Sequence, residues 1–261
     1  MRRFFLTGED PRPEKLNQVI TLSGPVYNHA VNSLRHREGD RIELVDGSGR
    51  AFTCEIVKID SETLDCRVLA AERAGGEPEV EVYLAQALAK KDNFELVLQK
   101  ATEIGARAFY PLTTSNTVVE LSSSRAERRL RRWEKIIREA ARQSERGIVP
   151  ELLEFTSIKE LTEEFAGFDL VLLAAARCQE SPLRRVLQQF GETLSAQGKK
   201  ETPRIMVLIG PEGGFTPSEI DDILAAGENV QPVSLGPRIL RTETAGPLLT
   251  GLILYELGEM E

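Results

Sequence analysis

The chain has 261 residues, of which 41% are hydrophobic and 28% are charged, and its formal net charge is −8. This length is enough for one large domain or two ordinary ones with a buried core. No stretch approaches the roughly 20 consecutive apolar residues of a membrane-spanning helix, and the N-terminus turns polar too soon for a signal peptide. We therefore expect a cytoplasmic protein that does not enter a membrane.

Cysteine and histidine usage argues against a disulfide framework or a metal centre. The three cysteines, Cys54, Cys66 and Cys178, are an odd number without CxxC spacing, so we interpret them as reduced packing residues. His29 and His36 are seven residues apart, with no cluster of carboxylates or cysteines around them. This arrangement does not resemble a metal site, and we expect none.

The first part of the chain has the pattern of a small β-barrel or sandwich. Residues 41–59 form two alternating apolar runs around the turn sequence Asp-Gly-Ser-Gly at 46–49, which predicts a β-hairpin. A further strand is predicted at 63–69. Before the hairpin, residues 23–39 predict one short helix that follows a serine cap and ends before a glycine.

A polar, glycine-rich stretch at 71–79 separates this pattern from a different one, so we predict domains 1–72 and 73–261. From residue 80 onward, nearly continuous apolar strands alternate with helices. Such alternation predicts a parallel sheet covered by helices on both faces. The predicted strands are 80–88, 108–112, 169–176, 204–210 and 230–236, and the predicted helices are 92–104, 125–146, 217–226, 243–257 and one that begins at residue 182.

The helix predicted at 125–146 is strongly basic, with nine Arg or Lys residues against four Glu. One interpretation is a solvated helix whose charges pair at i,i+4 spacing. The other is a face that binds phosphates of a nucleic acid. The segment alone leaves both open.

The loop after the strand at 204–210 predicts a ligand site, because ligands of parallel α/β sheets bind at the carboxyl ends of the strands. Thr216, Pro217 and Glu219 predict a capped helix start immediately after it. Glu212 inside the loop disfavours a triphosphate, and the glycine spacing fits neither a dinucleotide nor a P-loop motif. A ligand with hydroxyls, an amine or a positive centre fits better, and a tight turn without any ligand remains an alternative.

A second polar loop, at 234–246, follows the next strand and precedes the last helix, and long polar loops at adjacent strands often form a pocket. The sequences IGPEGGF at 209–215 and SLGPRILRTETA at 234–245 closely resemble the paired C-terminal motifs of the RsmE family of 16S ribosomal RNA uridine-N3 methyltransferases, within the SPOUT superfamily. Arg142 and Glu145 depart from the family pattern, which commonly has a small residue at the latter position. The similarity extends over the chain and includes 29–49, 98–112 and 132–152.

The resemblance implies a fold, a cofactor and a substrate. The fold would be a PUA-like RNA-binding β-barrel followed by a SPOUT α/β domain with a parallel sheet and a deep trefoil knot, usually in a homodimer. The cofactor would be S-adenosyl-L-methionine, and the substrate would be one uridine of 16S rRNA in the small ribosomal subunit. Matched by position, the cofactor would contact Leu173, Ala174, Ile209, Gly210, Pro211, Glu212, Gly213, Leu235, Gly236, Ile239, Leu240, Arg241, Thr242, Thr244 and Ala245.

The same resemblance implies RNA contacts, and the placement of charged residues on the two loops suggests catalytic groups. Uracil N3 carries a proton at neutral pH, so methylation needs a base or a stabiliser of the uracil anion. We hypothesise that Arg241 stabilises charge on a uracil carbonyl and that Glu243 or Glu212 assists proton removal. The alternative interpretation of Glu243 is a carboxylate in the first turn of the last helix that is stabilised by the helix dipole and has no catalytic role. The candidate RNA-binding residues are Arg2, Arg3, Arg35, Arg37, Arg128, Arg129, Arg132 and Arg138.

Other functions remain possible at this stage. A SPOUT methyltransferase could act on another base or on a ribose 2′-hydroxyl. A non-catalytic ribosome-assembly factor could use the barrel and the basic helix to bind RNA alone. A nucleotide-dependent hydrolase would need a phosphate or metal site, for which the sequence has no signal. Intact pocket motifs favour an enzyme.

Overall fold

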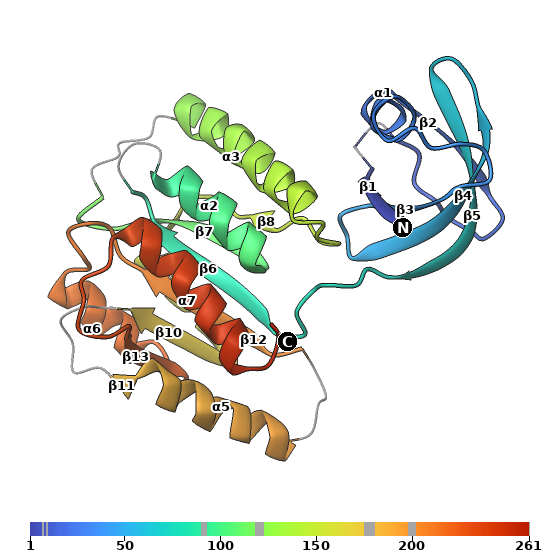
Figure 1. The fold of residues 1–261 in the computed structure, drawn as a ribbon. Helices are drawn as coiled ribbons and strands as arrows, with labels where there is room; N and C mark the ends of the chain where they lie inside the picture. Colours follow the sequence, from blue (N-terminus) through green and yellow to red (C-terminus); the bar gives the residue numbers. More distant parts are fainter. Residues whose placement is uncertain are drawn as a thin grey trace. The chain divides into compact units, whose positions relative to one another are not determined.

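The computed structural model describes residues 1–6, 8, 10–89, 93–117, 123–174, 181–197 and 202–260. The chain divides into two compact units, and Figure 1 colours it along the sequence. The first unit is Met1–Glu77 with Ala141–Val149, and the second is Pro78–Ala140 with Pro150–Glu261.

The first unit is completed by a segment from much later in the chain. The predicted boundary follows residue 72, whereas the unit continues to Glu77 and also includes residues 141–149. In the returning segment, a Cβ added to Gly147 would stand 2.1 Å from the Cβ of Ala74. Because only glycine fits so close an approach, this contact selects the residue. A pattern of strands along the chain cannot reveal it.

A five-stranded sheet forms most of the first unit, in the order β1-β3-β4-β5-β2. The hairpin predicted at 41–59 is confirmed, and its inward-facing side chains, such as Ile42 and Phe52, are buried in the core of the unit. β1 pairs in parallel with β3, and the other pairs are antiparallel. The strands are β1 (Arg2–Phe5), β2 (Val19–Ser23), β3 (Arg41–Val45), β4 (Arg50–Ile59) and β5 (Thr63–Arg73).

The helix predicted over 23–39 is wrong in its length. The structure forms α1 (Gly24–Tyr27), continues as a π-helical turn (Asn28–Ser33) and then stops. Arg35 has a φ of 59°. This left-handed conformation ends a right-handed helix, so the helix finishes before the glycine that was expected to terminate it.

The second unit contains an eight-stranded sheet, and all of its strand pairs are parallel, as the sequence predicts. Its strand order is β11-β13-β10-β12-β6-β7-β8, and β9 pairs with β7. Three two-residue strands, β8, β9 and β11, were not predicted because they are too short to show a period. The strands are β6 (Glu81–Ala87), β7 (Ala108–Thr113), β8 (Glu151–Leu152), β9 (Thr156–Ser157), β10 (Leu170–Ala174), β11 (Ser181–Pro182), β12 (Arg204–Ile209) and β13 (Val230–Ser234).

Helices cover both faces of this sheet, which confirms the prediction. On one face α7 packs against α2, β6 and β12, and Figure 1 shows α2 and α7 side by side. On the other face, Leu161 of α4 and Ile223 of α6 share a core cluster with Tyr83 and Leu208. The helices are α2 (Asn93–Ile104), α3 (Ser123–Gln143), α4 (Ile158–Glu163), the 3₁₀ turn Phe165–Gly167, α5 (Leu183–Gln197), α6 (Pro217–Ala225) and α7 (Thr242–Glu256).

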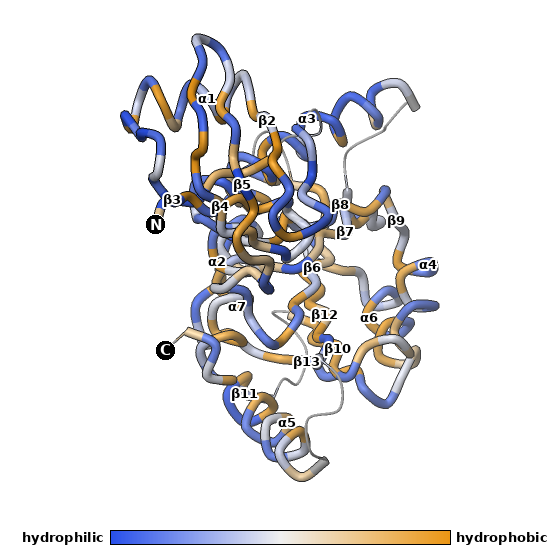
Figure 2. Tube along the Cα trace, turned by 90° about the vertical axis from the view of Figure 1, so that its right-hand side faces the viewer, coloured by the Kyte–Doolittle hydropathy of each residue, from blue (hydrophilic) through white to orange (hydrophobic). Residues whose placement is uncertain are grey.

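The basic helix α3 is amphipathic, and it ends three residues earlier than predicted. Trp133, Ile137 and Ala140 are buried along one side, while the charged residues occupy the exposed side. Figure 2 shows the helix as mainly hydrophilic. Helix α3 ends at Gln143 because Glu145, two residues beyond, has a φ of 54°.

Replacing Glu145 by glycine is expected to stabilise the protein. A left-handed conformation is strained for a residue with a Cβ, and glycine removes that strain at a smaller cost in backbone entropy. We expect a gain of about 0.5–1 kcal/mol in the free energy of unfolding, measured by urea denaturation. Glu145→Ala loses the same carboxylate but keeps the Cβ, so it is the matched control. Equal effects of the two substitutions would show that the conformation is not the cause.

The described cysteines are packing residues, as predicted. Cys54 and Cys66 are buried free thiols, and burial raises the pKa of each to about 12, so neither ionises at neutral pH. Cys178 lies outside the described residues. Within the described part of the chain, no group of three or more His, Cys, Asp and Glu residues is placed to hold a metal ion. None of the helices described there combines the length and the apolar character that a bilayer crossing requires.

Candidate active site

A cavity of about 680 Å³ lies at the carboxyl ends of β10, β12 and β13, within the second unit. The two polar loops follow β12 and β13, which we expected to be adjacent strands. In the sheet, β10 lies between them. The two loops therefore enclose the cavity from either side of β10, whose last residue, Ala174, contributes to the lining. This is the edge at which ligands of parallel sheets bind.

The loop between β12 and α6 is held by hydrogen bonds at its far end. Thr216 and Glu219 form the predicted capping box. The Glu219 carboxylate also accepts a hydrogen bond from the Ser115 backbone N–H at 2.7 Å. Burial by itself raises the pKa of Glu219, but the N–H groups of Ser115 and Thr216 outweigh it and hold the pKa below its usual range. A charged Glu219 thus fastens the start of α6.

A turn after β7 also holds this loop. The Asn116 side-chain amide donates to the Gly214 carbonyl at 2.9 Å and to the Gly213 carbonyl at 3.5 Å. Gly214 has a φ of 71°, a conformation that favours glycine. A Cβ added to Gly210 would stand 3.2 Å from the Phe215 ring, so the loop folds tightly on itself. The glycines here leave backbone polar groups accessible to a ligand.

The second loop, 235–241, has the more exposed side chains. Gly236 turns the chain with a φ of 99°, and its N–H donates to the Ser234 hydroxyl at 3.2 Å. Ile239 lines the cavity and yet is 90% exposed. A large apolar side chain in this position is available for contact with a ligand.

Two charged residues meet where this loop enters α7. A guanidinium nitrogen of Arg241 lies 3.7 Å from a carboxylate oxygen of Glu243, and the two side chains are 84% and 12% exposed. Glu243 is in the first turn of α7, where the helix dipole stabilises a carboxylate. Glu212 lines the cavity from the first loop. The cavity lining thus includes the carboxylates of Glu212 and Glu243 and the guanidinium groups of Arg238 and Arg241.

Most of the residues predicted to contact a cofactor lie around this one cavity. Leu173 does not, because it is buried in the core cluster under the sheet, and Thr244 is exposed on α7 outside the lining. The predicted residues that line the cavity are Ala174, Ile209, Gly210, Pro211, Glu212, Gly213, Leu235, Gly236, Ile239, Leu240, Arg241, Thr242, Glu243 and Ala245.

The structure adds lining residues that sequence reasoning missed. Gly214, Phe215, Ser234, Pro237 and Arg238 belong to the same two loop motifs, so their place in the motifs was a usable signal. The others come from neighbouring elements, and their place at the cavity depends on the tertiary structure. They are Asn93, Ile220 and Val233.

The predicted RNA-binding arginines of the first unit differ in their availability. Arg35 and Arg37 are exposed, and the exposed Arg2 pairs with Glu145 at 3.6 Å. Arg3 is largely buried, and its guanidinium bonds the Glu43 carboxylate and backbone carbonyls. Arg3 thus has a structural role, which its sequence position did not indicate.

The predicted RNA-binding arginines of α3 all lie on its exposed side. Arg132 donates to Glu95 of α2 at 2.7 Å, and the backbone carbonyl of Ser124 accepts from Arg128 at 3.3 Å. Both proposed functions of the helix therefore have a basis, since some of its charges are paired while an exposed basic surface remains.

Comparisons with known proteins agree with this architecture. The RNA methyltransferase domain family matches residues 76–254, and the RNA methyltransferase PUA domain family matches residues 22–69. Ribosomal RNA small subunit methyltransferase E of Bacillus subtilis is 32% identical over 98% of this chain and 97% of its own length. The protein of the same name from Synechocystis is 34% identical over 89% of this chain and 72% of its own length.

A solved structure extends the likeness to the whole fold. It is the ribosomal RNA small subunit methyltransferase E from Neisseria gonorrhoeae bound to S-adenosyl methionine, with 28% identity, a TM-score of 0.75 and coverage of 98% of this chain and 97% of that one. The fold and the cavity thus define an RNA methyltransferase with an N-terminal PUA domain. Within that class, the chain belongs to the ribosomal RNA small subunit methyltransferase E family. The family inferred from the two loop motifs is confirmed.

Proposed function

We propose that this protein transfers a methyl group from S-adenosylmethionine to N3 of a specific uridine in 16S rRNA of the small ribosomal subunit, in the cytoplasm. The observation that carries the proposal is the cavity at the ends of β10, β12 and β13, built from the two loops whose motifs define the family. The relative from Neisseria gonorrhoeae, which shares the fold, is bound to S-adenosyl methionine.

The residues around the cavity fit this cofactor. Ile209, Leu240 and Ala245 supply apolar walls, and the glycine-rich first loop offers backbone donors and acceptors. Among the described residues of the lining none is a lysine, and the Glu212 carboxylate would repel phosphates but attract a sulfonium. The bound cofactor would supply an electrophilic methyl group. The protein's part is to hold the uracil nitrogen close to that group and in line with it.

The catalytic contribution of the chain would come from charge placed near the uracil. Arg241 is exposed on the cavity side and can reach a uracil carbonyl, where negative charge develops as N3 loses its proton. Glu243 orients the guanidinium, and Glu243 or Glu212 accepts the proton directly or through water. The balanced reaction consumes the N3–H bond and yields N3-methyluridine, S-adenosylhomocysteine and a proton.

RNA would bind through exposed basic surfaces on each unit. Arg2, Arg35 and Arg37 of the first unit, and the exposed side of α3 in the second, provide positive charge despite the acidic chain as a whole. Phosphate contacts of this kind give affinity and little sequence choice. We therefore propose that the shape of the folded RNA selects the target uridine.

We further propose that the protein is a homodimer with a knotted C-terminal region, as the SPOUT resemblance implies. Leu248, Leu252 and Tyr255 are exposed apolar side chains on α7, at the helical spacing that places them on one side. A second copy of this chain would cover them. Light scattering should then give twice the 29.0 kDa of one chain, and a monomeric mass would exclude this interface.

The function is tested by incubating the protein with S-adenosylmethionine and unmodified small ribosomal subunits, followed by nuclease digestion and mass spectrometry. N3-methyluridine should appear. A different methylated nucleoside, such as a 2′-O-methylated one, would exclude the proposed target atom. RNA binding without any methylation, on subunits and on naked rRNA, would favour a ribosome-assembly factor.

A further inference from the structure

A buried glutamine beneath the cavity joins its two loops. Gln86 is at the carboxyl end of β6 and is fully buried. Its side-chain amide donates to the Thr242 hydroxyl at 2.7 Å, and that hydroxyl donates to the Gly210 carbonyl at 2.8 Å. Gly210 begins the first loop, and Thr242 directly follows the second. One side chain thus connects the bases of both loops.

The hydrogen-bond directions in this chain are fixed. Thr242 accepts from the Gln86 amide nitrogen and donates to a carbonyl that can only accept, so a reversed Gln86 amide would break the relay. The same amide nitrogen also donates to the Ala87 carbonyl at 3.3 Å, which supports this orientation. Thr242 is itself buried. Buried hydrogen bonds of this kind hold their partners more firmly than exposed ones.

The side-chain carbonyl oxygen of Gln86 has an unfavourable environment. Within the described residues, its carbonyl oxygen is buried and has no hydrogen-bond partner. A Cβ added to Gly246 of α7 would stand 2.7 Å from that oxygen. Gly246 is inside a helix, where glycine is unfavourable, so its presence makes room for Gln86. An apolar residue at position 86 would avoid the unpaired oxygen.

We propose that Gln86 is a positioning residue that, through Thr242, fixes loops 210–214 and 235–241 in the spacing that binds the cofactor. The inference rests on the proposed function for the identity of the ligand. Gln86 is absent from the cavity lining, so it acts on the ligand only through the loops. An unpaired buried oxygen and a helical glycine are costs to stability that are explained when the relay serves binding.

The test uses Gln86→Leu, Thr242→Val and the double variant. Thr250→Val is the matched control, because Thr250 is also a fully buried threonine of α7, but its hydroxyl donates to the Gly246 carbonyl within the helix. Isothermal titration calorimetry with S-adenosylhomocysteine should show a Kd about tenfold higher for each single variant, since displaced supporting groups typically weaken a site by that order. The Kd of the double variant should be no higher than that of the single variant that binds less tightly, because both substitutions break the same relay.

Loop order is measured separately in the free protein by hydrogen–deuterium exchange. Amides of 210–214 and 235–241 should exchange faster in Gln86→Leu and Thr242→Val, with the rest of the sheet unchanged. Gly246→Ala, which displaces the Gln86 oxygen without removing a polar group, should do the same. RNA affinity should stay within twofold of wild type, whereas a general folding defect would lower it too.

The outcomes separate the inference from the function. If wild-type protein binds no S-adenosylhomocysteine, the proposed function fails, and the exchange experiment still decides whether Gln86 orders the loops. If wild type binds and Gln86→Leu binds equally well, the positioning role is wrong. An equal loss in Thr250→Val would also overturn it, because the effect would then not depend on the relay.

Discussion

Replacing Arg241 by alanine is expected to lower the rate constant of methyl transfer by about 10²–10³-fold, the usual effect of removing one stabiliser of developing charge. The guanidinium is the positive group that the structure places beside Glu243 at the cavity. The Arg241 side chain is 84% exposed, and its partner Glu243 keeps the stabilisation of the α7 dipole, so the fold should not change. The defect should therefore be chemical.

The measurement is single-turnover methylation at saturating cofactor and RNA. Arg241→Lys keeps the charge but loses the planar fork, so it should retain an intermediate rate. Arg185→Ala makes the same charge change at an exposed position of α5 outside the cavity lining, and it should react like wild type. Calorimetry with S-adenosylhomocysteine should show that Arg241→Ala still binds. Near-normal turnover in Arg241→Ala would refute its role.

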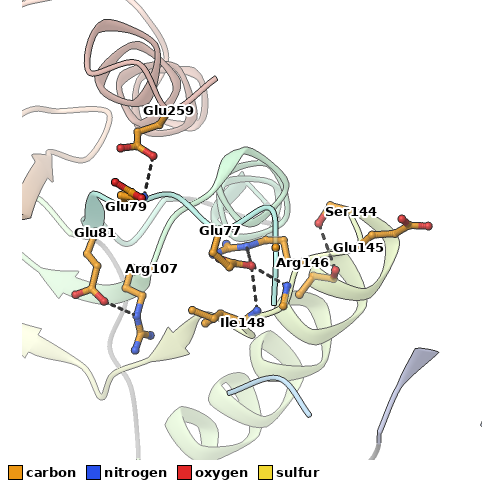
Figure 3. Close-up of polar contacts among 12 residues, drawn as sticks. Glu77, Glu79, Glu81, Arg107, Ser144, Glu145, Arg146, Ile148 and Glu259 are labelled. Carbon is orange, nitrogen blue, oxygen red and sulfur yellow. Dashed lines mark hydrogen bonds and ion pairs between the residues drawn. The ribbon is translucent and has the colours of Figure 1, made fainter. Parts of the chain in front are cut away.

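The second large effect is expected at the buried ion pair that closes the first unit. Glu77 and Arg146 are 3% and 6% exposed, and their carboxylate and guanidinium approach to 2.6 Å. The same carboxylate accepts from the backbone N–H groups of Gly147 and Ile148, as Figure 3 illustrates around Glu77. One carboxylate, that of Glu77, thus bonds three consecutive residues of the returning segment.

Glu77→Ala should lower the free energy of unfolding by about 3–5 kcal/mol, because it removes a buried carboxylate that bonds the Arg146 guanidinium and two backbone N–H groups. Glu77→Gln keeps acceptors for the backbone N–H groups and should cost less. The control is Asp60→Asn, since the Lys58–Asp60 pair is exposed on the same unit and should contribute about 0–1 kcal/mol. Guanidinium denaturation measures all three. A loss at Glu77 no larger than at Asp60 would show that the buried pair is not needed.

Local sequence patterns predict the types of most elements and the two loops that line the cavity. Apolar runs that alternate with helices specified a parallel sheet, and the capping box at Thr216 and Glu219 formed as predicted. Both loops are contiguous motifs directly after strands, so a sequence pattern includes nearly all their residues. Local rules sufficed there because each feature depends on neighbours along the chain.

Other features depend on residues that are distant in sequence, and they are known from the folded structure. In the structure, β10 lies between β12 and β13, and Gln86 contacts Thr242. Residues 141–149 belong to the first unit. Arg3 makes internal contacts. A hydrophobic period states which face of an element is buried, but not which partner buries it. Partner choice arises from packing across the whole fold, and in this protein that packing brings the two loops to one cavity.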